Sequence, residues 1–196
     1  MAPETPQKVE DSAVLDKLVS PMPIGTFNRW FADYLAQSPL EVERLLCDRT
    51  AVQFLIAWSL LETGCFHGFA QGKELKSHCT RLVEVENFDA KVLAPIVAAF
   101  HSRYKNKKRY ANLMHDHALP DIKDLLARPI LSLSPLEKVF LVVSVIFRYR
   151  NNIFHGTKGV QSWLVFKPQI EQCIQAMQHL LSHGKAVSGE EGKDAA

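Results

Sequence analysis

Several features that would point to a familiar class of enzyme or exported protein are missing from this sequence. None of the four cysteines are paired as C-x-x-C, so the default expectation is reduced thiols, with Cys47 and Cys173 buried as small hydrophobic residues. No Gly-rich phosphate loop, G-x-S-x-G or H-E-x-x-H occurs, which leaves classical nucleotide-binding and hydrolase readings without support. The longest apolar run, residues 139–147, is too short to span a bilayer.

Strong charge of one sign is also absent. The chain has 23 Lys and Arg against 21 Asp and Glu, and a net charge of +2 is too small to argue nucleic-acid binding from composition alone. With 196 residues, 47% of them hydrophobic, the chain can bury one sizeable core. The opening "MAPETPQKVED" has no apolar stretch of the kind found in signal peptides, so we expect a cytoplasmic protein that does not enter membranes.

The apolar residues follow a helical period almost throughout. Neither a convincing period-2 strand nor an internal repeat occurs, and only "WLVF" at 163–166 looks strand-like. The tetrapeptide "SPLE" occurs at 38–41 and at 134–137, and each copy has the serine, proline and glutamate of a capped helix start. We predict an all-α bundle of five to seven helices as one domain over 11–184, between flexible tails at 1–10 and 185–196.

Individual helices can be bounded from the same signals. We expect one over 51–63 that ends at Gly64, and one over 89–104 in which Pro95 either makes a kink or marks the first turn. A last helix from about Pro168 carries a one-sided apolar stripe and should close at Gly184. The segments at 68–88 and 115–129 are predicted to connect the longer helices and to contain shorter helical pieces. The helix over 134–155 is apolar all round its middle, except at Ser144, and is therefore predicted to be central.

This central helix ends in "FRYRNNIFHG", a cluster of polar side chains beyond an apolar anchor. At about 100° per residue, Arg148, Asn151 and His155 share one face of a regular helix, whereas Arg150 joins His155 only if the last turn unwinds. Histidine exchanges protons near neutral pH, arginine binds phosphate, and asparagine can orient either. A polar cap on a helix end is the alternative, but capping needs one cation and leaves the rest unexplained.

The segment "RYRNNIFHG" resembles the signature of the HEPN superfamily, which is an arginine, a polar residue and then a histidine after four to six intervening residues. "FLIAWSLLETGCFHGF" and "FHSRYKNKKRYANLM" add to the likeness, which covers about residues 54–181. The resemblance implies a HEPN-like helical domain with the motif at the C-terminal end of its long helix. It also implies a homodimer whose two motifs form a composite active site.

What the resemblance implies about function is a metal-independent endoribonuclease that cleaves RNA by attack of the 2′-OH, as a toxin or antiviral defence effector. By carry-over, Arg150, Asn151 and His155 are the catalytic residues; helical geometry adds Arg148 and Asn152 as supporting residues. No cofactor or metal is expected, and an antitoxin or defence-system partner protein is expected. The alternatives are a non-catalytic HEPN module that binds nucleic acid or a partner protein, and a structural helical protein.

A second candidate is the basic segment "RYKNKKRY" at 103–110, with five cations and two tyrosines. Cations contact phosphates and tyrosines stack on bases, so the segment could be an RNA track, although a solvated charge run is the alternative. Asn106 suggests a helix end that would present the cluster on a loop. The expected RNA-binding residues are Arg103, Tyr104, Lys105, Lys107, Lys108, Arg109, Tyr110 and Lys158.

The remaining histidines and cysteines do not form a recognisable metal pattern. Ten residues separate Cys65 and His67 from His78 and Cys79, a spacing that matches no standard structural zinc site. The "HDH" at 115–117 reads as a polar turn.

Overall fold

The computed structural model describes residues 24–66, 68, 70–86, 88–115, 119–154 and 165–188. All regular secondary structure within these residues is helical, which confirms the all-α prediction. The chain divides into two compact units, Met1–Asp48 and Arg49–Ala196, inside the range that the sequence predicted as one domain. In the described helices, none has the length and apolar character needed to cross a bilayer.

The described part of the first unit is a pair of helices, α2 (Ile24–Leu35) and α3 (Pro39–Cys47). The first "SPLE" begins α3 as predicted: Ser38 Oγ accepts from the Glu41 backbone N–H at 3.3 Å, and the Glu41 carboxylate accepts from the Ser38 N–H at 3.0 Å. Cys47 is exposed at the end of α3, so the prediction that it is buried was wrong. The buried face of this short helix carries Val42 and Leu45 instead.

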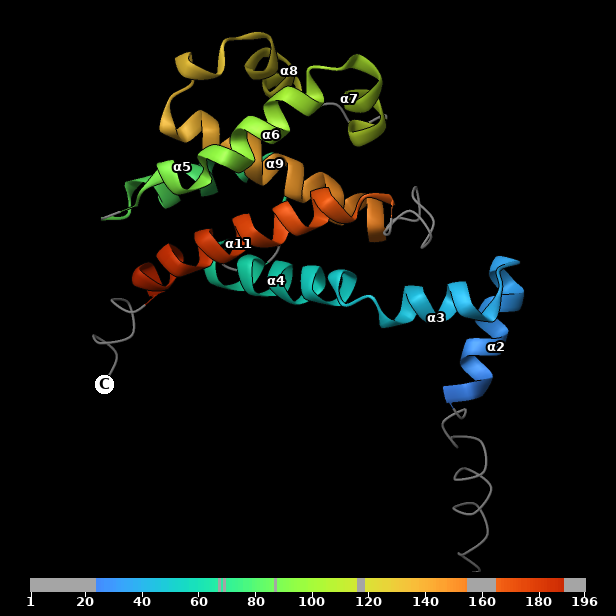
Figure 1. Cartoon of the computed structure of the whole chain (residues 1–196). Helices are drawn as coiled ribbons and strands as arrows, with labels where there is room; N and C mark the ends of the chain where they lie inside the picture. The colour runs from blue at the N-terminus through green and yellow to red at the C-terminus, as the bar shows by residue number, and fades with distance from the viewer. Residues whose placement is uncertain are drawn as a thin grey trace, which may run out of the picture. The chain divides into compact units, whose positions relative to one another are not determined.

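The second unit contains the other helices. They are α4 (Thr50–Cys65), α5 (Leu75–Glu84), η1 (Ala90–Leu93), α6 (Ala94–Tyr104), α7 (Lys107–Met114), α8 (Pro120–Ala127), η2 (Ile130–Ser132), α9 (Pro135–Phe154) and α11 (Lys167–Ser188). Helix α9 contacts α5, α6, α7, α8 and α11, and α11 lies along α4. Within this unit α9 therefore lies between a layer made of α4 and α11 and a layer made of α5, α6 and α8 (Figure 1).

The central position of α9 follows from its composition. Six of its apolar residues have no exposed surface, including Val139, Leu141 and Ile146, and they join the core with residues such as Phe54 of α4 and Phe100 of α6. Burial of one large aliphatic or aromatic side chain contributes about 1.5–3 kcal/mol, so a helix apolar on all sides is stabilised where neighbours cover it.

Several predicted boundaries agree with the structure. Pro95 lies in the first turn of α6 and does not kink it, and Cys173 is buried as predicted. The second "SPLE" caps α9 through the Ser134–Glu137 pair.

Two predicted helix ends and one predicted strand differ from the structure. Helix α4 continues through Gly64 to Cys65, and α11 continues past Gly184 to Ser188, so neither glycine ends its helix. One glycine inside a helix costs only about 1 kcal/mol relative to alanine, which tertiary packing can offset. Of the strand-like "WLVF", Val165 and Phe166 are not in a strand, and the first two residues lie outside the described part.

Candidate functional site

Arg150 and Asn151 form a hydrogen-bonded pair in the last turn of α9. The Arg150 Nη1 group donates to Asn151 Oδ1 at 3.0 Å, and both side chains are half-buried. The amide oxygen therefore helps to fix the direction of the guanidinium. A half-buried guanidinium of fixed direction is suited to binding an anionic group, because little side-chain freedom remains to be lost on binding.

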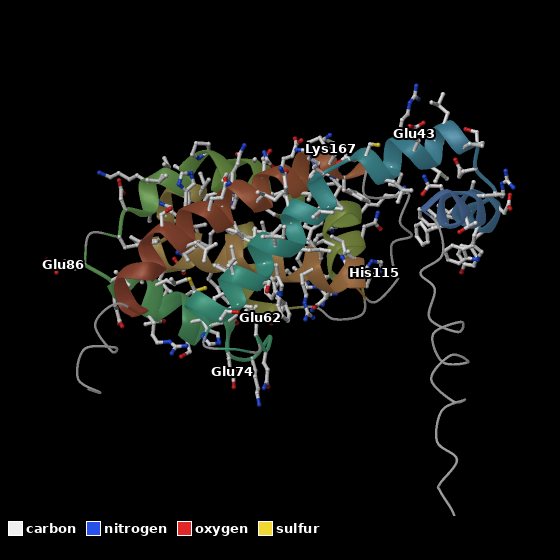
Figure 2. The ribbon with its side chains drawn as sticks, turned by 90° about the horizontal axis from the view of Figure 1, so that it is seen from below. Glu43, Glu62, Glu74, Glu86, His115 and Lys167 are labelled. Atoms are coloured by element: carbon white, nitrogen blue, oxygen red, sulfur yellow. The ribbon has the colours of Figure 1, made fainter. Side chains whose placement is uncertain are left out.

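Trp58 of α4 supplies the surface against which Arg150 lies. The Arg150 Cζ atom is 5.7 Å from the centre of the Trp58 ring, within the range of a cation–π contact. The indole N–H of Trp58 donates to Glu62 Oε2 at 3.1 Å, and Glu62 Oε1 accepts from the Ala70 N–H at 3.0 Å. Figure 2 shows Glu62 on α4. Neither Trp58 nor Glu62 is among the site residues predicted from the sequence. Their only signal was a tryptophan and a glutamate four residues apart in an otherwise apolar helix.

Arg148 and Asn152 point to a different neighbour, the C-terminal end of α7. Arg148 donates from Nη2 to the Met114 carbonyl at 2.6 Å and from Nε to the Leu113 carbonyl at 3.4 Å, and Asn152 Nδ2 donates to the same Leu113 carbonyl at 2.9 Å. The last carbonyls of a helix have no partner within that helix, so both side chains cap α7.

Burial agrees with this structural role. Arg148 is 5% exposed and Asn152 is 2% exposed, and burial lowers the pKa of the Arg148 guanidinium from its ordinary value. Arg148 therefore points into the protein against the carbonyls of α7, whereas Asn151 pairs with Arg150. The arginine that remains half-exposed in this turn is Arg150.

The histidine of the motif cannot be placed with them. Helix α9 is regular up to Phe154, so its last turn is not unwound within the described residues. His155 and Lys158 lie outside the described residues, and so does Gly156.

The basic segment is divided between two helices and does not lie on a loop. Arg103 and Tyr104 end α6, and Asn106 caps α7 by accepting from the Arg109 N–H at 3.1 Å. The prediction of a loop was wrong because asparagine also favours the first position of a helix. The exposed cations of the segment are Lys105, Lys107, Lys108 and Arg109.

The two tyrosines of the segment are not free to stack on bases. Tyr104 is 3% exposed, and its hydroxyl lies 3.0 Å from the Tyr149 hydroxyl of α9. Burial raises the pKa of Tyr104 to about 12, and it raises the pKa of Tyr149 as well. Tyr110 is half-buried and donates to the Leu119 carbonyl at 3.4 Å. The expected role of Tyr104 in RNA stacking is therefore corrected to a contact between α6 and α9.

Among the described residues, α9 is flanked by at least two cavities. One of about 90 Å³ lies near its C-terminal end, between α6 and α7; its lining residues are Arg103, Tyr104, Arg109, Asn112, Leu113, Tyr149 and Phe166. The other, of about 520 Å³, lies at the N-terminal end, about 20 Å along the axis from Arg150 at 1.5 Å per residue.

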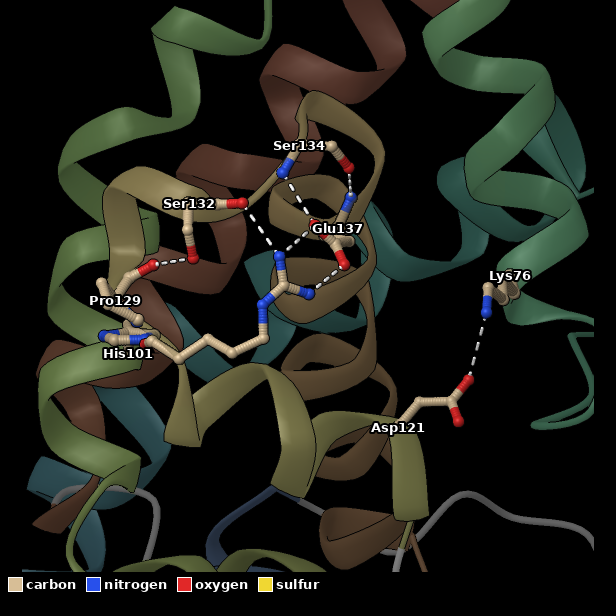
Figure 3. Close-up of polar contacts among 8 residues, drawn as sticks. Lys76, His101, Asp121, Pro129, Ser132, Ser134 and Glu137 are labelled. Carbon is tan, nitrogen blue, oxygen red and sulfur yellow. Dashed lines mark hydrogen bonds and ion pairs between the residues drawn. The ribbon is translucent and has the colours of Figure 1, made fainter.

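Four of the five charged groups that line the larger cavity form two ion pairs, and the fifth is Asp124. Lys76 of α5 contacts Asp121 of α8 at 3.4 Å, and Arg128 binds Glu137, which also accepts from the Ser134 N–H at 2.8 Å (Figure 3). The Arg128 contact and the bonds to Ser134 lower the pKa of Glu137. The two pairs therefore link α5 to α8 and the end of α8 to the start of α9.

Within the described residues, no three His, Cys, Asp or Glu side chains gather as a metal site would need. His78 and Cys79 are buried in α5, where His78 packs on Phe66 at 4.8 Å between ring centres. His115 is exposed and ends α7 (labelled in Figure 2). Cys65 is buried at the end of α4, and His67, Asp116 and His117 lie outside the described residues.

Comparison with known proteins adds no assignment: no family model, no curated protein and no solved structure matches the chain.

Proposed function

We propose that this protein is a metal-independent endoribonuclease of the HEPN type, with Arg150, Asn151 and His155 as its catalytic residues. The observation that carries the proposal is the separate use of the two arginines of α9. Arg148 is buried and caps α7, whereas Arg150 is half-exposed and is oriented by Asn151 and Trp58. Arg150 is also the arginine that the motif resemblance selects.

The chemistry follows from these side chains. His155 would take the proton from a ribose 2′-OH, whose oxygen attacks the adjacent phosphorus. The bond from phosphorus to the 5′-oxygen breaks, and that oxygen gains a proton. The products are a 2′,3′-cyclic phosphate and a 5′-hydroxyl end. Arg150 would stabilise the charge that develops on the phosphate oxygens, while Asn151 holds the guanidinium in place.

The proposal includes a homodimer in which the ends of two α9 helices face each other. Single-stranded RNA or an RNA loop is the preferred substrate, because its backbone can reach the in-line geometry of attack. A toxin or antiviral defence role, with an antitoxin or defence-system partner protein, belongs to the same proposal. Light scattering on the purified protein tests the dimer.

The test of the nuclease is RNA cleavage in EDTA, analysed for cyclic phosphate ends. We expect the wild type to cleave, and His155→Ala and Arg150→Ala to lose about 10²–10⁴-fold in rate, the range for a general acid–base group or a charge-stabilising donor. Arg44→Ala, a change at an exposed arginine of α3, is the matched control and should cleave as the wild type does.

Two results would contradict the nuclease. One is intact RNA with the wild type under all conditions. The other is cleavage that survives both His155→Ala and Arg150→Ala.

A non-catalytic HEPN module that binds nucleic acid is the second candidate, favoured by the exposed lysines around the start of α7. In that case His155→Ala would leave function intact, and charge reversal at Lys107, Lys108 and Arg109 would abolish RNA binding. Band-shift assays with the two kinds of variant distinguish the candidates.

A further inference from the structure

The small cavity between α6, α7 and α9 has the composition of an anion site. Two cationic side chains line it, Arg103 from the end of α6 and Arg109 from the first turn of α7, together with the amide of Asn112. The other lining residues are apolar or are the paired tyrosines Tyr104 and Tyr149. We propose that this cavity binds a single phosphate group.

The charges at the cavity favour an anion. No carboxylate lines the cavity, and in the described part of the chain neither Arg103 nor Arg109 takes part in an ion pair. The Nε atom of Arg103 is buried and has no hydrogen-bond acceptor among the described residues. A buried donor without an acceptor is unfavourable, and a phosphate oxygen would satisfy it. Guanidinium groups bind phosphate through parallel hydrogen bonds, so two arginines match a phosphate dianion.

The volume limits what can enter. At about 90 Å³ the cavity can hold a small group such as one phosphate. Pockets for drug-sized ligands are about 300–1,000 Å³, so a nucleoside would remain outside. The ligand class is therefore a molecule that presents a phosphate group, with the rest of the molecule on the surface.

Hydrogen bonds from side chains other than Arg103, Arg109 and Asn112 hold the walls of the cavity in place. The hydroxyls of Tyr104 and Tyr149 join α6 to α9 at 3.0 Å. Arg148 and Asn152 hold the Leu113 carbonyl, and Leu113 also lines the cavity. Because α7 carries both Arg109 and Asn112, the capping of α7 by α9 fixes two of the three polar groups. Such preorganisation lowers the cost of binding.

The source of the phosphate connects the cavity to the motif. Tyr149 precedes Arg150 in α9, so a phosphate in the cavity lies close to the end of α9 that carries the motif. If the proposed function is right, which this step assumes, the phosphate belongs to RNA and the cavity anchors one end or one linkage of the substrate. A small phosphate-bearing molecule is the other source with the same chemistry.

The test is calorimetric titration of the full-length His155→Ala chain with inorganic phosphate and with two short oligoribonucleotides, one 5′-phosphorylated and one with a 5′-hydroxyl. We expect Arg103→Gln and Arg109→Gln, each made in the His155→Ala chain, to weaken binding of inorganic phosphate at least tenfold. Lys123→Gln in that background is the control. It removes one positive charge from an exposed position of α8, and Lys123 does not line the cavity. We expect less than about a twofold change, because salt screens a charge that does not contact the bound anion.

Three outcomes would support the proposal and identify the source. Tighter binding of the 5′-phosphorylated oligonucleotide indicates a terminal phosphate. Equal binding of both oligonucleotides, displaced by inorganic phosphate, indicates a linkage within the RNA backbone. Binding of phosphate without RNA indicates a small molecule.

Two outcomes would overturn the proposal. One is an equal loss of phosphate affinity in Arg109→Gln and Lys123→Gln, since diffuse charge would then explain the binding. The other is no phosphate or RNA binding by a chain whose circular dichroism shows it to be folded. Because binding is measured in a chain without His155, a wild type that binds phosphate but cuts no RNA would leave the cavity standing while the nuclease fails.

Discussion

Arg148 and Arg150 are two residues apart in α9, and helical geometry turns them about 200° away from each other. One guanidinium meets the carbonyl end of α7 and the other meets the ring of Trp58. We predict that Arg148→Ala lowers the free energy of unfolding by about 2–4 kcal/mol, because two buried carbonyls lose a charged donor and a cavity forms. Arg150→Ala should cost only about 1 kcal/mol, mainly for the cation–π contact. Urea unfolding followed by circular dichroism measures both.

The same pair of variants separates stability from activity. Arg150→Ala should remove RNA cleavage while the chain stays folded, whereas Arg148→Ala should lose activity only as far as it unfolds. Equal losses of stability in the two variants would contradict the different environments described for the two arginines.

For individual side chains, the sequence predicted contacts between neighbours in one helix better than contacts with residues from other helices. The adjacency of Arg150 and Asn151 could be read directly from "RNN". The capping role of Arg148 could not, because it depends on where Leu113 and Met114 lie, more than thirty residues earlier in the sequence. The burial of Tyr104 and the position of Trp58 beside Arg150 depend on tertiary packing in the same way.

Helix starts were predictable because their signals are local. Each "SPLE" carries the serine and the glutamate that bind each other's backbone, and both form in the structure. Asn106 was ambiguous, because the residue that ends one helix can cap the next. The end of α11 was missed, because a packed apolar stripe can carry a helix through one glycine.

The contact between α6 and α9 predicts a loss of stability at high pH. Burial raises the pKa of Tyr104 to about 12, and it also raises the pKa of Tyr149, whereas an unfolded tyrosine titrates near 10. Below pH 10 both tyrosines stay protonated in the folded and in the unfolded chain, so they do not change the free energy of unfolding with pH. As the pH rises from 10 toward 12 only the unfolded chain loses these protons, so the free energy of unfolding falls, by about 1 kcal/mol per tyrosine at pH 11.

Urea midpoints at pH 8 and pH 11 measure this effect. Tyr104→Phe should reduce the difference between the two midpoints, because it removes one of the buried phenols. Tyr34→Phe, at a tyrosine that is 74% exposed, is the control and should leave the difference as it is in the wild type. An unchanged difference in Tyr104→Phe would refute the role given to that hydroxyl.

Over the whole molecule, the sequence predicted one domain and the structure divides at Asp48 and Arg49. No Gly-rich or Pro-rich linker marks this boundary, since "CDRT" joins one helix directly to the next. The motif resemblance, which covers about 54–181, nevertheless lies entirely within the second unit. The main hydrophobic cluster does too, because its buried members run from Phe54 to Leu180.

A chain that keeps this cluster complete should fold without the first unit. We predict that residues 49–188 alone show a helical spectrum and unfold cooperatively in urea, with a midpoint close to that of the same unit in the full chain. A second fragment, 66–188, is the control: it lacks α4 and with it Phe54, Trp58 and Leu61, so it should be unfolded or unfold without cooperativity. Unfolding of the 49–188 fragment under native conditions would mean that the second unit depends on the first for its stability.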